Sequence, residues 1–394
     1  MMNFSRIAFL SALVLGAIAC SSSDDNKGGG GGGQNPPPGG GGCSGDGCIA
    51  VALSLAGDVS CAIMKDGTGR CWGPAYTGGR GRGDKEKSSG PEPMAVTELT
   101  AAADIFINNN ASCARLRDGT VKCWGDGNGS GNGTGEAEGG KAVPAAVNAT
   151  GSVKALVGSD SRVCALLQDG GASCWQQMLA IAPAAPDPSL VPVKVPTVVG
   201  ATELAVGGDH ICILNASGVV SCYGFNKSGQ LGYVTDSASD ELKPVTDLPA
   251  AAHVWASDDS SCAALKDGKL ACWGSNRGDG NAEAGPEAVI VTGVANVTSV
   301  AVGGEHTCAV VQDGSVWCWG ANEHGQLGDG TTTDQAKPVK VAGITDATVV
   351  AVSKEASCII RKDGKVLCWG SNPAGQFGAR TENPTVTTPF VVPL

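Results

Sequence analysis

Aromatic residues, histidines and clustered positive charges are all scarce in this chain of 394 residues. Phe, Trp and Tyr together make up 4%, and 27 Lys and Arg against 38 Asp and Glu leave a formal net charge of −11. The densest basic stretch is the short one from Arg80 to Lys87. Surfaces that bind nucleic acid need larger basic patches, so we predict no nucleic-acid partner.

Catalytic and cofactor motifs are also missing. The sequence contains no phosphate-binding loop, zinc-binding helix, dinucleotide fingerprint or Gly-x-Ser-x-Gly nucleophile elbow. The segment from Asp126 to Glu138 places oxygen-bearing side chains at calcium-loop offsets, but Ala137 stands where a bidentate carboxylate is needed. We interpret this segment as a polar surface loop, with a calcium site as the alternative. We predict no catalytic residue, no cofactor and no metal site.

Cysteine and glycine are abundant, with 17 and 60 residues. The stretch that begins at Cys308 shows how the two are combined. Its Gln-Asp-Gly tripeptide lies between two apolar runs and predicts a three-residue hairpin loop, with Gly314 in the left-handed conformation that glycine adopts at low cost. This loop makes Val311 and Ser315 the closing pair. Cys308 is then directly opposite Cys318 and within disulfide reach.

This unit recurs seven times along the chain. Each copy has two cysteines ten residues apart, a glycine six residues after the first cysteine and an aromatic residue directly after the second. A cysteine framework of this kind is typical of an oxidising compartment. We predict one disulfide within each hairpin: Cys61–Cys71, Cys113–Cys123, Cys164–Cys174, Cys212–Cys222, Cys262–Cys272, Cys308–Cys318 and Cys358–Cys368.

The spacing of the copies indicates the fold. Their first cysteines are separated by 46 to 52 residues, and each copy adds a short apolar strand before the hairpin and another after it. Four short strands in such a period are typical of a propeller blade. Residues 49–394 are therefore predicted to form an all-β, seven-bladed β-propeller with one hairpin disulfide per blade. Thr388 to Leu394 supplies the last strand, and we expect the first and last strands to meet and close the ring.

The amino-terminal residues predict export. Residues 1–19 combine Arg6 with an apolar run too short to span a bilayer comfortably, as in a signal peptide. Cys20 follows Ala-Ile-Ala, which resembles the lipobox of bacterial lipoproteins, and we predict that Cys20 is lipidated. Ordinary cleavage that leaves Cys20 as a free thiol is the alternative. The predicted location is the bacterial cell envelope, as an outer-membrane lipoprotein or at the cell surface, with membrane attachment through the lipid only.

Residues 20–48 are predicted to be a tether rich in Gly, Pro and Ser, because they have almost nothing apolar to bury. The tether ends at Cys43 and Cys48, which we predict to close a small disulfide loop at the edge of the folded part. A metal site is the alternative interpretation. Two thiolates without a nearby His or second Cys pair do not make a tetrahedral ligand set.

Two segments of the sixth copy carry a family resemblance. Val302–Val310 contains Gly-Gly-Glu-His before the first cysteine, and Trp319–Gly330 contains Gly-Gln-Leu-Gly. Both resemble the repeat of the regulator of chromosome condensation family. The resemblance extends over the whole folded region. The resemblance implies a seven-bladed propeller. The family's founding role, nucleotide exchange on a small nuclear GTPase, is the less favoured function here, because the signal sequence, paired cysteines and acidic charge indicate an exported protein.

Histidine and tryptophan positions also follow the repeat. His210 and His306 occupy matching places in their copies, so we predict a structural role in the blade rather than catalysis. The tryptophans that follow second cysteines are interpreted as packing residues. Trp255 and Trp317 stand outside that register and are better candidates for exposed contacts.

The predicted function is that of a monomeric, surface-anchored, non-catalytic scaffold that recognises a protein or glycan. The loops Gly73–Pro93, Gly125–Val143 and Gln176–Val191 depart most from the Gly-Gln-Leu-Gly pattern, and they are predicted to form the binding face. Unconstrained insertions are the alternative interpretation of these loops. An extracytoplasmic hydrolase or lyase with a site at the channel mouth is the alternative function, although acid and base residues do not converge on a few loops.

Overall fold

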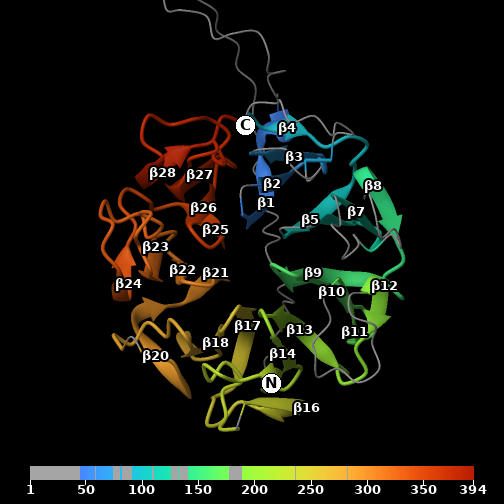
Figure 1. Cartoon of the computed structure of the whole chain (residues 1–394), viewed down its shortest axis with the longest axis vertical. Coiled ribbons are helices and arrows are strands. Elements are labelled where there is room, and N and C mark those ends of the chain that lie inside the picture. The colour runs from blue at the N-terminus through green and yellow to red at the C-terminus, as the bar shows by residue number, and fades with distance from the viewer. Residues whose placement is uncertain are drawn as a thin grey trace, which may run out of the picture.

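The computed structural model describes residues 45–57, 59–73, 80–81, 91–108, 111–125, 133, 141–176, 189–235, 237–281 and 283–394. These residues form seven antiparallel sheets of four strands each. The sheets are arranged like blades around a central axis (Figure 1). The predicted seven-bladed β-propeller is confirmed.

Every blade is built from four consecutive strands, the first nearest the axis (Figure 1). Blades 1 to 3 contain β1 (Ala50–Ala56), β2 (Val59–Met64), β3 (Gly69–Trp72), β4 (Met94–Ala95), β5 (Ala102–Ile107), β6 (Ser112–Leu116), β7 (Val121–Gly125), β8 (Lys141–Val147), β9 (Val153–Ser159), β10 (Arg162–Leu167), β11 (Ala172–Gln176) and β12 (Ser189–Lys194). A short 3-10 helix, η1 (Gly45–Cys48), precedes them.

The other four blades follow the same order. They contain β13 (Ala201–Val206), β14 (His210–Asn215), β15 (Val220–Phe225), β16 (Ala238–Pro244), β17 (Ala251–Ser257), β18 (Ser260–Leu265), β19 (Lys269–Gly274), β20 (Gly285–Ala295), β21 (Val297–Val302), β22 (His306–Val311), β23 (Val316–Gly320), β24 (Gln335–Lys340), β25 (Ala347–Val352), β26 (Ala356–Arg361), β27 (Val366–Ser371) and β28 (Thr385–Val391).

The central hairpin of blade 6 has the predicted loop. The backbone N–H of Val311 donates to Ser315 O over 3.0 Å, and that of Gly314 donates to Val311 O over 2.8 Å. Gly314 has a φ of 82°, in the left-handed region. Asp313 adds a side-chain bond, because its Oδ1 accepts the N–H of Ser315 over 2.8 Å. The closing pair and the glycine position predicted from the sequence are therefore confirmed.

All seven predicted hairpin disulfides are present. In blade 6, Cys308 lies directly opposite Cys318 in the ladder between β22 and β23. Their Cα atoms are 4.1 Å apart, and the other six pairs have separations of 4.0 or 4.1 Å. The paired cysteines are buried in every blade. Each bridge joins two strands of one blade, so none crosses from one blade to the next.

The hydrophobic core is divided among the interfaces between blades. One cluster joins Cys212, Leu231 and Val245 of blade 4 to Val254 and Trp273 of blade 5. The tryptophans that follow second cysteines are fully buried, as predicted for packing residues: Trp72, Trp124, Trp175, Trp273, Trp319 and Trp369. Stability of the ring therefore depends on contact between neighbours, as in other repeat architectures.

The ring closes where blade 1 meets blade 7, the blue and red blades that lie side by side in Figure 1. The expectation that the first and last strands meet is wrong. β1 pairs only with β2, and it packs against β25 and β26, the inner strands of blade 7. The reason is that blade 7 is completed by its own fourth strand, β28, so it needs no strand from blade 1.

Candidate binding face around the channel mouth

One face of the ring carries two sets of loops. Strands alternate in direction within each blade, so the connection from first to second strand and the connection from third to fourth strand leave the sheet on the same side. We call this side the loop face, and the opposite side, which carries the Asp-Gly hairpin turns, the turn face. The three loops predicted to bind a partner follow β3, β7 and β11, so they start on the loop face.

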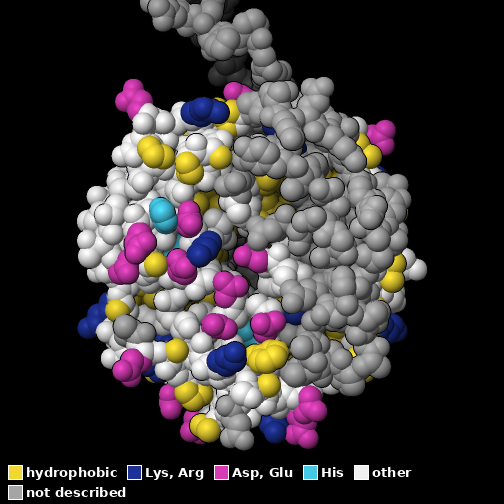
Figure 2. Space-filling view, viewed as in Figure 1, with side chains coloured by type: hydrophobic (Ala, Val, Ile, Leu, Met, Phe, Trp, Pro, Cys, Tyr) yellow, Lys and Arg dark blue, Asp and Glu magenta, His cyan; other side chains and the backbone are white. Residues whose placement is uncertain are grey.

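Carboxylates gather at the mouth of the central channel on the loop face. Asp160, Asp258, Asp259 and Glu305 lie in connections between first and second strands. Acidic side chains lie along the part of the central hollow's rim that Figure 2 shows in colour. The Nζ atom of Lys354 lies 3.2 Å from Oε1 of Glu305 and offsets part of this charge. The mouth is therefore acidic over the described blades 3 to 7.

Crowding of these carboxylates affects their ionisation. Partial burial raises the pKa of Asp258, and the nearby charge of Asp160 raises it further, while Lys354 lowers it. Asp160 is solvent-exposed, but the walls of the mouth reduce the hydration of its carboxylate and raise its pKa as well. Ionised carboxylates in this position oppose folding at neutral pH, because each binds its proton more tightly in the folded state.

The Gly-Gln-Leu-Gly loops owe their shape to two amide side chains. In blade 4, Oδ1 of Asn226 accepts the N–H of Leu231 over 2.8 Å, and Oε1 of Gln230 accepts the N–H of Ser228 over 2.9 Å. Leu231 is fully buried beneath the loop. The same pairs of bonds recur in blades 6 and 7, made by Asn322, Gln326, Asn372 and Gln376.

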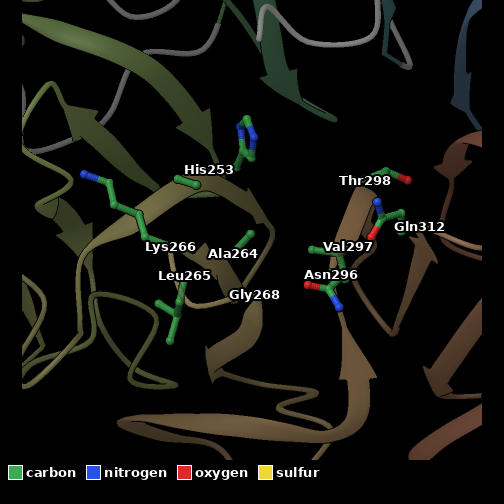
Figure 3. A pocket seen from close by; sticks show the side chains of 10 residues that line it. His253, Ala264, Leu265, Lys266, Gly268, Asn296, Val297, Thr298 and Gln312 are labelled. Atoms are coloured by element: carbon green, nitrogen blue, oxygen red, sulfur yellow. The ribbon is translucent and has the colours of Figure 1, made fainter. Parts of the chain in front are cut away.

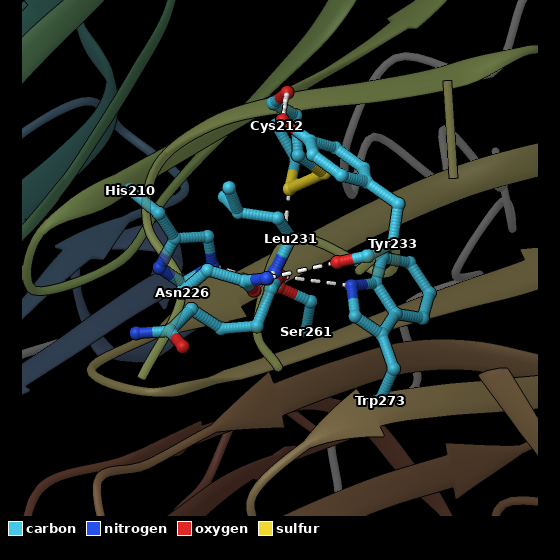
Figure 4. The surroundings of a disulfide bond; sticks show 9 residues. His210, Cys212, Asn226, Leu231, Tyr233, Ser261 and Trp273 are labelled. Atoms are coloured by element: carbon cyan, nitrogen blue, oxygen red, sulfur yellow. Dashed lines mark hydrogen bonds between the residues drawn. A yellow bond between two sulfur atoms is a disulfide. The ribbon is translucent and has the colours of Figure 1, made fainter. Parts of the chain in front are cut away.

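A buried polar cluster ties this loop to the next blade (Figure 4). The carbonyl oxygen of Gln230 accepts the hydroxyl of Ser261 over 3.0 Å and the indole N–H of Trp273 over 2.9 Å. Nε2 of His210 lies 2.8 Å from the same hydroxyl. We call this arrangement the latch. His210 and Gln230 belong to blade 4, and Ser261 and Trp273 belong to blade 5, so the latch spans the junction.

The His210–Ser261 pair has the wrong polarity and the wrong location for catalysis. The Ser261 hydroxyl donates its proton to Gln230 O, so Nε2 of His210 must be the donor to the serine oxygen. A catalytic histidine would instead accept the serine proton. Both side chains are fully buried, which also excludes substrate. His210 is buried at the junction between blades 4 and 5, a position that fits the structural role predicted for it.

The latch occurs a second time, between blades 6 and 7. Nε2 of His306 lies 2.7 Å from the Ser357 hydroxyl, which donates to Gln326 O over 2.8 Å. The indole of Trp369 donates to the same carbonyl over 2.8 Å. Burial lowers the pKa of His210 to about 3 and that of His306 to about 4, so both imidazoles are neutral at physiological pH.

Blades 1 and 2 keep one element of this design despite their different loops. Gly81 and Gly133 both have positive φ, and each lies against the indole of the next blade's tryptophan, Trp124 or Trp175. Gly232, Gly278 and Gly328 make the same contact in later blades. This contact was not predicted from the sequence. Its signal is one glycine retained between the third and fourth strands in blades whose loops otherwise diverge.

Several predicted residues lie outside the described part of the chain. They are Cys20 and Cys43, the calcium-like segment apart from Gly133, and most of the three candidate binding loops. Within the described residues, no three His, Cys, Asp or Glu side chains gather closely enough to hold a metal ion. None of the described segments forms an apolar helix of membrane-spanning length. Trp255 and Trp317 are both half-buried and pack against the cluster between blades 5 and 6.

A groove of about 390 Å³ lies on the turn face between blades 5 and 6 (Figure 3). Leu265 and Val297 form its apolar part, and Gln312 contributes an amide. Lys266 is directed away from the groove in Figure 3, and its Nζ donates to Ser217 O of blade 4 over 3.2 Å. His253 also lines the groove, and its Nδ1 lies 2.7 Å from Oε1 of Glu203.

Comparison with known proteins identifies the repeat. A family model described as the regulator of chromosome condensation (RCC1) repeat matches residues 297–326 and 348–376, and a second model of the same description matches residues 313–359. These matches fall in blades 6 and 7, so residues 297–376 carry RCC1-type repeats. A regulator of chromosome condensation from Drosophila melanogaster is 38% identical over 79 residues, which are 20% of this chain and 14% of that protein.

The RCC1-type propeller is also found in solved structures. Yeast RCC1 (Prp20), from the structure of Kap60 bound to it, has a TM-score of 0.70 at 20% identity, covering 87% of this chain and 84% of that chain. Prp20p from Saccharomyces cerevisiae has a TM-score of 0.70 at 20% identity over 88% and 87%. Human WBSCR16 has a TM-score of 0.69 at 17% identity over 79% and 87%. At these identities the likeness establishes the fold.

Proposed function

We propose that this protein is a non-catalytic binding scaffold, anchored at the cell envelope through Cys20, that recognises a protein partner with its loop face. The RCC1-type propeller supports a role of the binding-scaffold or regulator kind. The observation that carries the proposal is the position of three divergent loops. They start on one face, in three consecutive blades, beside an acidic channel mouth. Recognition commonly resides in such loops on a rigid framework.

The structures of the yeast relative favour a protein partner over a glycan. One Prp20 structure contains Kap60 bound to it, and another concerns the binding properties of Prp20p to Gsp1p and histones. Those partners belong to Prp20. For this chain, they support only the general idea that an RCC1-type propeller presents a protein-binding face.

The direct test replaces the loops of blades 1, 2 and 3 with the loop of blade 6. The blade 6 loop brings its own tryptophan-facing glycine, Gly328, so folding should be preserved. We expect the full-length wild type to capture a protein from an envelope extract of the source organism, and the loop-replaced protein to lose it. A control variant, Lys266→Ala with Gln312→Ala, changes the turn face and should keep the partner. Unchanged affinity after loop replacement would exclude this binding face.

The anchor is tested separately. Growth with a labelled fatty acid should label the wild type, and Cys20→Ser should lose the label and move to the soluble fraction. An unlabelled, soluble wild type would show ordinary signal cleavage.

Pretreating the extract with glycosidases should leave capture unchanged. Loss of capture after that treatment would identify the ligand as a glycan.

A further inference from the structure

All seven junctions between blades share one backbone hydrogen bond. The N–H at or next to the start of each first strand donates to the carbonyl oxygen of the hairpin glycine in the preceding blade. The bonds, from 2.6 to 3.1 Å, are Ala102 to Gly67, Val153 to Gly119, Ala201 to Gly170, Ala251 to Gly218, Asn296 to Gly268, Ala347 to Gly314 and Ala50 to Gly364. The last of these closes the ring.

Six of the seven junctions are also crossed by the chain itself, because one blade ends and the next begins in a continuous segment. The junction between blades 7 and 1 is different. It has no linking segment, and no strand is exchanged across it. We call it the seam. Among the described residues, only non-covalent contacts hold it closed.

The seam has an apolar cluster but an incomplete latch. Leu53 and Trp72 of blade 1 pack with Ile360 and Phe377 of blade 7. The Ser60 hydroxyl donates to Gln376 O over 3.3 Å, which matches the serine–glutamine contact of the two complete latches.

The histidine of the latch is missing at the seam. Ala356 stands at the place that His306 occupies in blade 6. The indole nitrogen of Trp72 has no hydrogen-bond partner among the described residues, whereas the Trp369 indole donates to Gln326 O. The seam therefore lacks both the linker and two of the three polar contacts found between blades 6 and 7.

We infer that the seam is the point at which the ring opens, and that it opens before any single blade unfolds. Each blade keeps its four strands and its disulfide when the seam parts, because neither crosses the junction. Opening hydrates the apolar cluster around Trp72 and widens the channel. Regions with fewer stabilising contacts open at lower free energy than the rest of a protein.

Oxidative footprinting of tryptophan measures this opening. Trp72, Trp175 and Trp369 are all fully buried in the closed ring. Trp175 is the matched control, because its indole also lacks a partner among the described residues, but its junction has a linker. We expect Trp72 to be oxidised on the order of tenfold faster than either other residue in the native full-length protein. Equal rates for Trp72 and Trp175 would overturn the inference.

Completing the latch at the seam should slow the opening. A Cβ at position 207 would collide with the His210 ring, so a histidine in this position needs a glycine three residues before it. The test variant is therefore Ser353→Gly with Ala356→His, which places an imidazole beside Ser60. We expect oxidation of Trp72 to fall toward the rate of Trp369, while Ser353→Gly alone does not slow it. If Trp72 is oxidised no more slowly in a correctly folded double variant, the inference that the ring opens at the seam is contradicted.

Hydrogen exchange distinguishes opening of the seam from fraying of the first residues. The Ala50 amide should exchange faster than the six equivalent junction amides, and the double variant should slow it together with Trp72 oxidation. Rapid exchange at Ala50 with a protected Trp72 would indicate local fraying and would also overturn the proposal.

Discussion

The two faces of the propeller follow different rules. On the turn face, every blade repeats the same Asp-Gly loop or a close variant, and the hairpin glycine carbonyl bonds to the next blade at all seven junctions. On the loop face, complete latches occur at two junctions, and three blades have divergent loops. The difference indicates that the turn face maintains the ring, whereas the loop face is free to vary above a few anchoring contacts.

The turn face should be the more sensitive to substitution. A residue with a side chain at position 314 would have to adopt a φ of 82°. Its Cβ would lie 2.8 Å from Cα of Asp346 at the junction with blade 7. We expect Gly314→Val to lower the free energy of unfolding by about 2–4 kcal/mol. Ser315→Thr is the control, since blades 1 and 2 have Thr68 and Thr120 at this place, and it should change stability by less than about 0.5 kcal/mol. Equal thermal shifts for both variants would contradict the assigned turn.

Substitution of a latch histidine should lower the free energy of unfolding by a smaller amount, and this loss should depend on pH. His306→Ala removes a buried ring and its bond to Ser357, so we expect a loss of about 2–3 kcal/mol at pH 8. The folded-state pKa of His306 is about 4, below the ordinary value of 6.5, so its contribution is complete above pH 6.5 and is lost as the pH falls toward 4. The difference from wild type in denaturant unfolding should therefore shrink over that range. His324→Ala, an exposed histidine on the same face, should leave stability nearly unchanged. A difference independent of pH would argue against a neutral buried imidazole.

A weaker contact joins the first strands of blades 4 and 5. Nδ1 of His253 lies 2.7 Å from Oε1 of Glu203, and this carboxylate raises the pKa of His253. Its contribution is present below pH 6.5 and is lost as the pH rises through the raised pKa. Both side chains are about a third exposed, so Glu203→Gln should cost less than about 1 kcal/mol. We expect the cost at pH 6 to exceed that at pH 8.5. The reverse order would show that the ion pair does not stabilise the fold.

Removing a carboxylate at the acidic mouth should have the smallest effect on stability. This change should raise stability, whereas the preceding ones lower it. Asp258→Asn removes a carboxylate whose pKa is raised by burial and by neighbouring negative charges. Asparagine also tolerates the positive φ of this position, 35°. We expect Tm at pH 7.5 to rise on the order of 1 °C, with the gain disappearing at low pH as Asp258 becomes protonated. Asp267→Asn on the turn face, where bonds from Lys269 lower the carboxylate pKa, should not raise Tm. A lower Tm for Asp258→Asn would contradict the assigned repulsion.

The hairpins could be predicted from the sequence because their determinants are local. Asp313 and Gly314 specify the turn within five residues, and the turn fixes the register of Cys308 and Cys318. Repetition then indicated the number of blades. The same reasoning predicted the buried tryptophans, because each follows a cysteine whose orientation was already known.

The latch and the mouth could not be predicted in this way. His210 and Ser261 are 51 residues apart, and they meet only because successive blades pack side by side. A signal exists in hindsight: histidine occurs where a glycine stands three residues before it and the next copy has serine directly before its first cysteine. The charge repulsion on Asp258 depends on the diameter of the ring, which no local pattern encodes.

The uninterrupted path of the chain through each blade has a genetic consequence. A DNA segment that encodes β25 to β28 carries a complete sheet, its disulfide and one half of the contacts at each of its two junctions. Duplication or deletion of such a segment in frame adds or removes a whole module and leaves no strand without its partners. A ring closed by strand exchange lacks this freedom, since its first and last strands must be inherited together.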